Sequence, residues 1–436
     1  MPQTVTFCIR PIGAFRPLVR DCDGNIIELP EGEALQIGGA PVYPLNALGT
    51  NAEIYLSTGG DDDTGDGSPT GPFASIYRAA EHYGRFIPGD HNIRINVEAG
   101  IYDCPETFDV AYPYGAKLHW EGEAETFSNP AISNIAASAA TDGDFPELEY
   151  VDFDIELTGA DATEGYFVRL WSCANGTNPD GLNGTHEIVA WDAMNEIATC
   201  RVWRRLNTTE LPSGSITVAT AYLIKSVLHF TSDNHGFDIR GPFSFGTFDK
   251  IVVKGNPDAY ASQKRAVRLF NGADIRMDGG FLPISGGFFT GLSISEWGAG
   301  VELVGGSTFY SLRCGVAKIR DNAFTIGTHS RVLAAGGVPS LINGVNLRAL
   351  WAHGESAIVA TAIQMQSNGS PVVSEQGAFI DVRNARIHYD QGSGIAIFAD
   401  DLGRVLETGA TIVGFATDYS PTADTFGNNG SYIGTL

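Results

Sequence analysis

The chain has 436 residues, of which 51 are acidic and 27 are basic, so its formal net charge is −24. A chain this acidic repels phosphate backbones and anionic lipid, which argues against nucleic acid or a membrane surface as a partner. No apolar run approaches the ~20 residues that a membrane span needs. The N-terminus lacks the basic and apolar regions of a signal peptide, so none is expected.

The acidic charge has two interpretations. One is solubility; the other is a set of divalent-cation sites, or a neutral or cationic glycan partner. Six cysteines are scattered along the chain and none has a metal-ligand spacing, which predicts buried free thiols, a reducing compartment and no cofactor. The 53 glycines and the charged fraction of 18% are typical of short strands joined by turns.

Residues 1–50 form a first unit. Thr4–Ile9 alternates apolar and polar residues, and a second strand, Ile26–Leu29, follows a turn at Asp23–Asn25. Proline and glycine punctuate the remainder, and a unit of this size is too small to bury its own core. We therefore expect it to pack on a partner or on copies of itself.

Residues 51–128 begin with a strand, a polar loop and a helix. Strand Ile54–Thr58 precedes a loop of Gly, Asp, Ser, Thr and Pro at 59–69. The helix is expected from about Pro72 to Tyr83, because proline suits a first helical position, and Gly84 is expected as a left-handed cap. Short strands bounded by glycine follow. This order predicts the start of a right-handed parallel β-helix, with the helix lying across its open end.

Residues 129–225 carry longer strands, such as Val151–Leu157 and Glu196–Trp203, separated by hairpin-like turns. This pattern predicts a small antiparallel β-barrel inserted between coils. In residues 226–418 each segment is a Gly, four or five alternating residues, then Gly, Asn or Asp, at irregular intervals. Such a repeat of shape is what the coils of a large β-helix require. Residues 419–436 are expected to form a C-terminal cap or tail.

Several short motifs carry a family resemblance. They are Ile54-Tyr55-Leu56, Gly60-Asp61, Pro72-Phe73 at the helix start, Val97–Tyr102 at a strand end, Leu182–Ile188 in the insert and Phe248–Asn256 in a later coil. With these motifs, residues 51 to about 260 resemble the start of pectate-lyase-fold spike and fibre proteins of tailed bacteriophages.

That resemblance implies an all-β, pectate-lyase-like right-handed parallel β-helix that forms a homotrimer on a phage-like virion. Assembly in the bacterial host cytoplasm is implied as well. Residues 1–50 are the implied attachment to other tail or capsid proteins. The shaft is the implied receptor-binding part, which holds host surface polysaccharide during adsorption. The resemblance is not specific for an enzyme activity.

Carboxylates near aromatic residues are the candidates for polysaccharide chemistry. Depolymerases on this fold use two carboxylates, roughly 5 Å apart when retaining and ~6.5–9.5 Å apart when inverting. The candidate catalytic residues are Glu296, Asp278 and Asp381, and a structure is needed to show whether they line one groove. The candidate glycan-binding residues are Trp297, Trp351, His353 and Tyr389. Further carboxylates near aromatic side chains are Glu355, Asp390, Asp400 and Asp401.

Two functions stay open at this point. The first is a virion spike that binds host polysaccharide without cleaving it; the alternative is a depolymerase spike, either an endoglycosidase or a lyase. The residue sets of polygalacturonases and pectate lyases are not recognisable in the sequence, and the lack of a signal peptide argues against a third option, a non-viral carbohydrate-active enzyme. Asp61–Asp66 lacks EF-hand spacing, so a solvated turn is favoured there and no metal site is expected.

Overall fold

The computed structural model describes residues 18–20, 26–28, 35–37, 40–42 and 46–435, with gaps at 111, 113, 137–139, 206–210, 241–243, 272–273, 279–292, 298, 313–314, 334–340, 362, 369–370, 389–394, 414, 416 and 423–429. Two short antiparallel hairpins precede residue 46: β1 (Leu18–Arg20) with β2 (Ile26–Glu28), and β3 (Leu35–Ile37) with β4 (Ala40–Val42). The strand expected at Thr4–Ile9 lies outside the described residues.

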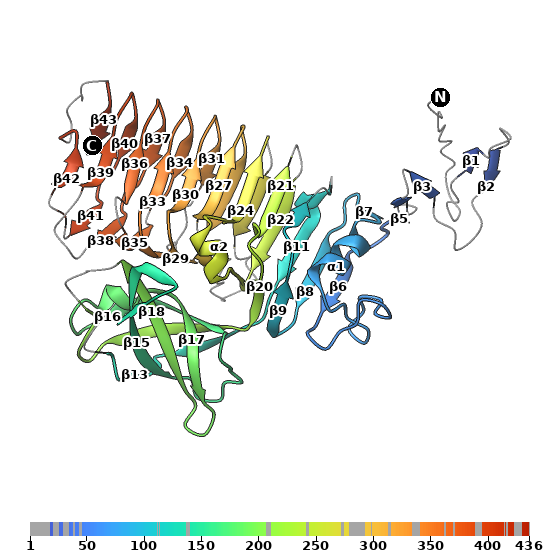
Figure 1. Cartoon of the computed structure of the whole chain (residues 1–436), viewed down its shortest axis with the longest axis horizontal. Coiled ribbons are helices and arrows are strands. Elements are labelled where there is room, and N and C mark those ends of the chain that lie inside the picture. The colour runs from blue at the N-terminus through green and yellow to red at the C-terminus, as the bar shows by residue number, and fades with distance from the viewer. Residues whose placement is uncertain are drawn as a thin grey trace.

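Three parallel sheets form the main body of the molecule (Figure 1). The first sheet contains β6 (Ala52–Leu56), β8 (Ile93–Val97), β11 (Leu118–Glu121), β22 (Ser244–Asp249), β25 (Asp274–Asp278), β28 (Thr308–Leu312), β31 (Arg331–Leu333), β34 (Ala357–Val359), β37 (Phe379–Asp381), β40 (Arg404–Leu406) and β43 (Tyr432–Gly434). The second contains β9 (Gly100–Cys104), β20 (Ser226–Phe230), β23 (Ile251–Lys254), β26 (Ser293–Trp297), β29 (Gly315–Ile319), β32 (Leu341–Val345), β35 (Gln364–Asn368), β38 (Arg386–His388) and β41 (Thr411–Val413). The third contains β10 (Phe108–Val110), β21 (Phe237–Arg240), β24 (Arg265–Phe270), β27 (Ala299–Val304), β30 (Asn322–Ile326), β33 (Arg348–Ala352), β36 (Val372–Ser374), β39 (Ile395–Ala399) and β42 (Thr417–Ser420).

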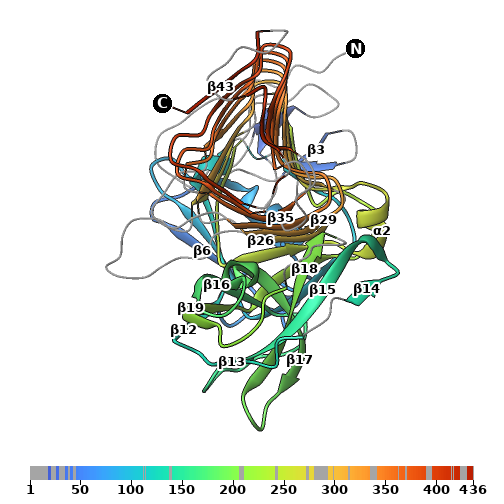
Figure 2. The same cartoon turned by 90° about the vertical axis from the view of Figure 1, so that its left-hand side faces the viewer.

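The chain visits these sheets in rotation, so each strand pairs in parallel with the strand one coil away. This is the topology of a parallel β-helix, and the expected parallel, mostly β architecture is confirmed. Figure 2 shows the coils stacked end-on, with the inserted sheet below them. The right-handed sense stays a prediction; it agrees with the strong general preference of parallel crossovers.

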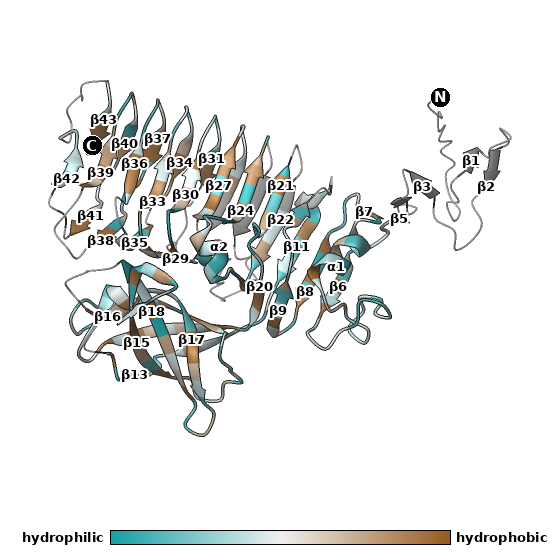
Figure 3. Cartoon of the chain, viewed as in Figure 1, coloured by the Kyte–Doolittle hydropathy of each residue, from teal (hydrophilic) through white to brown (hydrophobic). Residues whose placement is uncertain are grey.

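Apolar side chains at equivalent positions of successive coils build the core. In the third sheet one inward row is fully buried and runs through Val267, Val301, Phe324, Leu350, Val372 and Ile397. Each rung stacks on the next at about 4.8 Å, so one coil buries the apolar surface of its neighbour. Figure 3 shows this pattern as hydrophobic segments along the strands. Helix α2 (Pro257–Ala261) buries Ala259 and Tyr260.

Helix α1 (Ile76–Tyr83) lies at the N-terminal end of the stack (Figure 1), beside the short parallel pair β5 (Asn46–Ala47) and β7 (Phe86–Ile87). It starts four residues later than expected, because Phe73 makes a strand-like bridge: its N–H donates to Tyr55 O at 2.9 Å and its carbonyl accepts from Ser57 N at 3.0 Å. Ser75 is the N-cap instead. Gly84 ends the helix in a right-handed conformation, with φ −56°, so the expected left-handed cap is wrong.

The polar loop before α1 is held by its own carboxylates. Asp61 Oδ1 accepts from the backbone N–H groups of Asp63 and Thr64, at 2.8 and 3.1 Å. Asp62 Oδ1 accepts from the N–H groups of Ala74 and Ser75, at 2.8 and 3.0 Å. Within the described residues, no group of three or more His, Cys, Asp or Glu side chains could hold a metal ion. These carboxylates therefore brace the turn.

An eight-stranded antiparallel sheet is inserted between β11 and β20. Its strands are β12 (Ala124–Ser128), β13 (Ile132–Ser133), β14 (Ala140–Asp142), β15 (Phe145–Glu156), β16 (Phe167–Ala174), β17 (Gly184–Asp192), β18 (Ile197–Arg205) and β19 (Thr217–Ile224). Two short 3-10 helices are η1 (Gly115–Lys117), just before β11, and η2 (Pro179–Leu182), between β16 and β17. The insert begins and ends side by side, because Lys225 N–H donates to Glu123 O at 2.9 Å. Strands β17 and β18 lie against β29 and β32 of the second sheet. No helix in the described part of the chain is long and apolar enough to span a membrane.

Candidate functional site

The structure does not bring the three candidate catalytic carboxylates together. Asp278 ends β25 and Asp381 ends β37, and these strands are four steps apart in the first sheet. Four steps correspond to about 19 Å, against the ~5–9.5 Å of a glycosidase carboxylate pair. Glu296 lies in β26 of the second sheet. The side chain of Asp278 is outside the described residues.

Asp381 is committed to a local ion pair. Its side chain is 5% exposed, and its Oδ2 accepts from Arg383 Nη2 at 2.6 Å. Arg383 Nε donates to both carboxylate oxygens, at 2.9 and 3.0 Å. This fork geometry gives both carboxylate oxygens a charged hydrogen-bond donor, so Asp381 is occupied by Arg383.

Glu296 and Trp297 are adjacent in the sequence, but their side chains are buried in different places. Trp297 is fully buried in the β-helix core, where its Nε1–H donates to Val253 O at 3.3 Å and its ring lies 5.7 Å from that of Phe230. Its ring face is therefore covered. Glu296 is 6% exposed and points to the junction with the inserted sheet, where it pairs with Lys318 at 3.3 Å.

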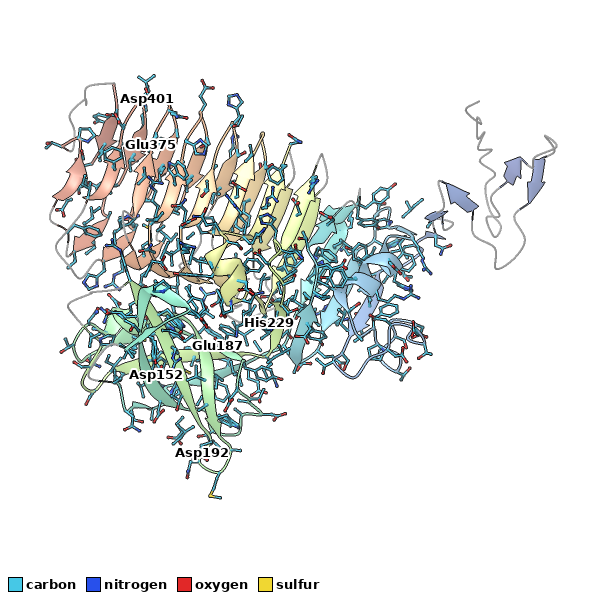
Figure 4. All side chains as sticks on the ribbon, viewed as in Figure 1. Asp152, Glu187, Asp192, His229, Glu375 and Asp401 are labelled. Atoms are coloured by element: carbon cyan, nitrogen blue, oxygen red, sulfur yellow. The ribbon has the colours of Figure 1, made fainter. Side chains whose placement is uncertain are left out.

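Trp351 and His353, by contrast, lie together on the outer face of the third sheet, half-buried, with ring centroids 4.9 Å apart. Trp351 is in register with Val373, and Val373 with Phe398, so three outward side chains stack on successive coils. Figure 4 shows Glu375 on this part of the stack, well away from Glu187 at the junction with the insert. Tyr389 and Asp390 lie outside the described residues.

A cavity of about 260 Å³ opens beside this row, and its described lining residues are Arg348, Val373, Glu375, Ile395 and Phe398. Its floor is apolar, and Arg348 and Glu375 supply one charge of each sign. A pocket with an apolar surface and few polar groups is the usual form of a small-ligand site. The two-carboxylate mechanism would need a second carboxylate beyond these lining residues.

Trp351 holds both charged residues of the cavity. The Arg348 guanidinium carbon lies 4.6 Å from the centre of the Trp351 ring, a cation–π contact. The indole Nε1–H donates to Glu375 Oε2 at 3.0 Å. Trp351 therefore positions Arg348 and Glu375 in addition to forming part of the surface.

His353 adds no charge to this site at neutral pH. Burial lowers the pKa of His353, and this effect outweighs the opposing influence of the nearby Glu375 carboxylate. Arg348 and Glu375 were not among the residues singled out from the sequence. Arg348 stands three residues before Trp351, but the coil that brings Glu375 beside them has no fixed length, so its position gave no signal.

These observations define a three-sheet parallel β-helix that carries an inserted antiparallel sheet and an aromatic, charged cavity on its outer face. Solved structures that are similar to the chain include two phage tailspikes. One is the Gp54 tailspike of Acinetobacter baumannii bacteriophage AP22 in complex with A. baumannii capsular saccharide, at 8% identity and a TM-score of 0.19, covering 78% of this chain and 64% of that chain. The other is the tailspike protein gp49 from Pseudomonas phage LKA1, at 10% identity and a TM-score of 0.19, covering 79% of this chain and 73% of that one.

The chain spans less than two thirds of the length of the first of these tailspikes. No protein-family model matches the sequence. A comparison with curated proteins gives no match either.

Proposed function

We propose that this chain is a spike or fibre protein of a phage-like virion and that it binds a host cell-surface polysaccharide during adsorption. The motifs between residues 51 and about 260 and the parallel β-helix topology support the spike assignment. The observation that carries the binding role is the outward row of Trp351, Val373 and Phe398 beside the cavity walls Arg348 and Glu375. Apolar rungs suit the C–H faces of sugar rings, and fixed charged groups suit their polar substituents.

The same proposal includes three features of assembly. The protein acts as a homotrimer, residues 1–50 attach it to other virion proteins, and the inserted sheet closes into a small barrel. A native mass measurement tests the first: a stable monomer at micromolar concentration would remove the trimer from the proposal.

Binding is tested by retention of the purified protein on host cells and on their extracted capsular or lipopolysaccharide. Trp351→Ala is expected to weaken retention by at least about tenfold, corresponding to roughly 1.4 kcal/mol, because it removes a rung and releases both cavity walls. Tyr114→Ala is the matched control, since Tyr114 is an aromatic residue that is 38% exposed near the other end of the stack. Equal retention of both variants and the parent would contradict the assignment of this face.

The depolymerase alternative is tested on the same samples. Release of new reducing ends or of unsaturated products from the polysaccharide would replace binding alone with cleavage. Retention without release supports the binding role.

A further inference from the structure

The charged side chains on the outer face of the third sheet are mostly paired with one another. Arg240 donates to Asp238 at 2.6 Å, and Glu302 Oε2 forms ion pairs with Arg265 Nε, at 3.2 Å, and Arg268 Nε, at 3.6 Å. These pairs lie on the earlier coils. Among the described residues of these coils, Arg240, Arg265 and Arg268 are therefore each paired with a carboxylate.

Arg348 lies on a later coil of the same sheet, and its side chain has different neighbours from those of the earlier arginines. Within the part of the chain that the structure describes, the Arg348 guanidinium contacts the Trp351 ring, with its carbon 4.6 Å from the ring centre, and no carboxylate lies within ion-pair distance of it. This is notable in a chain where 51 acidic residues outnumber 27 basic ones. A guanidinium held on an aromatic ring keeps its fork of N–H donors available for an anion in the cavity.

We infer that the cavity takes a sugar residue that carries a carboxylate, so that the bound polysaccharide contains an acidic sugar. The inference rests on the proposed glycan-binding function. The carboxylate meets Arg348, and the apolar face of the ring packs on Phe398, beside the buried Val373. The oxygen of Glu375 that is not bonded to Trp351 accepts from a hydroxyl group.

The net charge of −24 does not oppose this contact at physiological ionic strength. Charges farther away than about 8 Å are largely screened there, so the groups lining the cavity dominate. Glu375 is the one carboxylate among the described lining residues, and Trp351 already donates to it. Arg348 is therefore the cationic group among the described lining residues that can meet a carboxylate.

The test compares two monosaccharide probes that differ in one group, methyl β-D-glucuronide and methyl β-D-glucoside. Saturation-transfer NMR at millimolar concentration, with the full chain, measures both dissociation constants. The uronide is expected to bind at least about tenfold more tightly, and Arg348→Gln to abolish that preference, whereas Arg348→Lys keeps part of it. Arg331→Gln, which changes an exposed arginine of the first sheet, is the control and is expected to change nothing.

Equal affinity for the two probes, no binding of the uronide, or an unchanged preference in Arg348→Gln would each overturn the acidic-sugar inference. The proposed function fails differently: it fails if the parent protein is retained neither on host cells nor on their polysaccharides. Retention on cells without a uronide preference would therefore reject the inference and leave the binding role standing. Unchanged thermal unfolding midpoints of the variants confirm that the site, and not the fold, was altered.

Discussion

Glu296→Gln is expected to loosen the junction between the β-helix and the inserted sheet. Glu296 Oε1 lies 3.3 Å from Lys318 Nζ, and Oε2 lies 3.5 Å from Lys254 Nζ. The side chains of Glu296 and Lys318 are only 7% and 6% exposed. Lys318 Nζ also lies 3.6 Å from the Phe145 ring centre and 4.2 Å from that of Trp203, both from the insert. Burial raises the pKa of Glu296 and lowers the pKa of Lys318, so each group depends on its partner to stay charged.

The cost of each substitution follows from what it leaves behind. Removing the Glu296 charge leaves Lys318 buried with no carboxylate within ion-pair distance among the described residues, which costs about 3–5 kcal/mol. Lys254 is less affected, because it keeps Glu187 at 2.6 Å. Lys318→Met leaves Glu296 paired with Lys254 and places an apolar chain on the two rings. We expect that change to cost only about 2 kcal/mol, the size of a desolvated cation–π contact.

Hydrogen exchange of peptides from β26, β29, β17 and β18 measures this local opening. At 1.4 kcal/mol per factor of ten, Glu296→Gln should speed exchange there by about 140- to 4,000-fold. Lys318→Met should speed it less, and the double variant less than the product of the two. The reasoning is refuted if Lys318→Met has the larger effect, or if neither variant changes exchange at the junction.

Three further changes are expected to alter stability. Gly344→Ala should destabilise the junction by about 3 kcal/mol, because Gly344 has φ 60° and a Cβ there would lie 2.5 Å from Trp203 O. An unfolding midpoint equal to that of the parent protein would contradict this expectation. His186 is buried, and its Nε2 lies 2.8 Å from Leu182 O. Burial lowers the pKa of His186 from 6.5 to about 4. Between these two pH values the folded chain therefore binds fewer protons than the unfolded chain. The contribution of neutral His186 to the free energy of unfolding is therefore complete above pH 6.5 and falls by about 3 kcal/mol towards pH 4. The free energy of unfolding measured against pH should show this slope, and His186→Gln should lack it. Asn256→Ala should cost about 1–3 kcal/mol, because Asn256 caps α2 and donates to two carbonyls; denaturant midpoints test this, with Asn256→Asp expected to keep the cap.

The architecture could be predicted because its signal is local. Short alternating segments between glycines indicate stacked strands whatever the exact length of each coil. The start of α1 could not be placed, because Phe73 pairs with Tyr55, and that contact is not encoded by helix propensity. The cavity could not be predicted either, because it too depends on contacts between coils. Trp351, Val373 and Phe398 lie in one row, yet they are 22 and 25 residues apart in the sequence (373 − 351 and 398 − 373).

Glu296 and Trp297 were candidates for catalysis and glycan binding, and their adjacency in the sequence did not reveal that their side chains point to different places. Glu296 has φ 71° and Lys318 has φ 55°, so the backbone leaves the extended conformation at these positions and the alternation of side chains is broken. Trp297 therefore turns into the core, while Glu296 faces the inserted sheet. Non-glycine residues with positive φ carry a cost of about 1–3 kcal/mol, which persists here because both side chains anchor the junction.

The hydrogen bond between Lys225 N and Glu123 O has a consequence for the order of folding. Strand β20 must pair with β9 across the whole insert. Closing a flexible loop of about 100 residues costs roughly 4 kcal/mol of chain entropy. A folded insert brings the two ends to 2.9 Å, so the coil then closes as if joined by a tight turn. The insert should therefore fold before this coil does, and the stack should grow from a nucleus that already contains it.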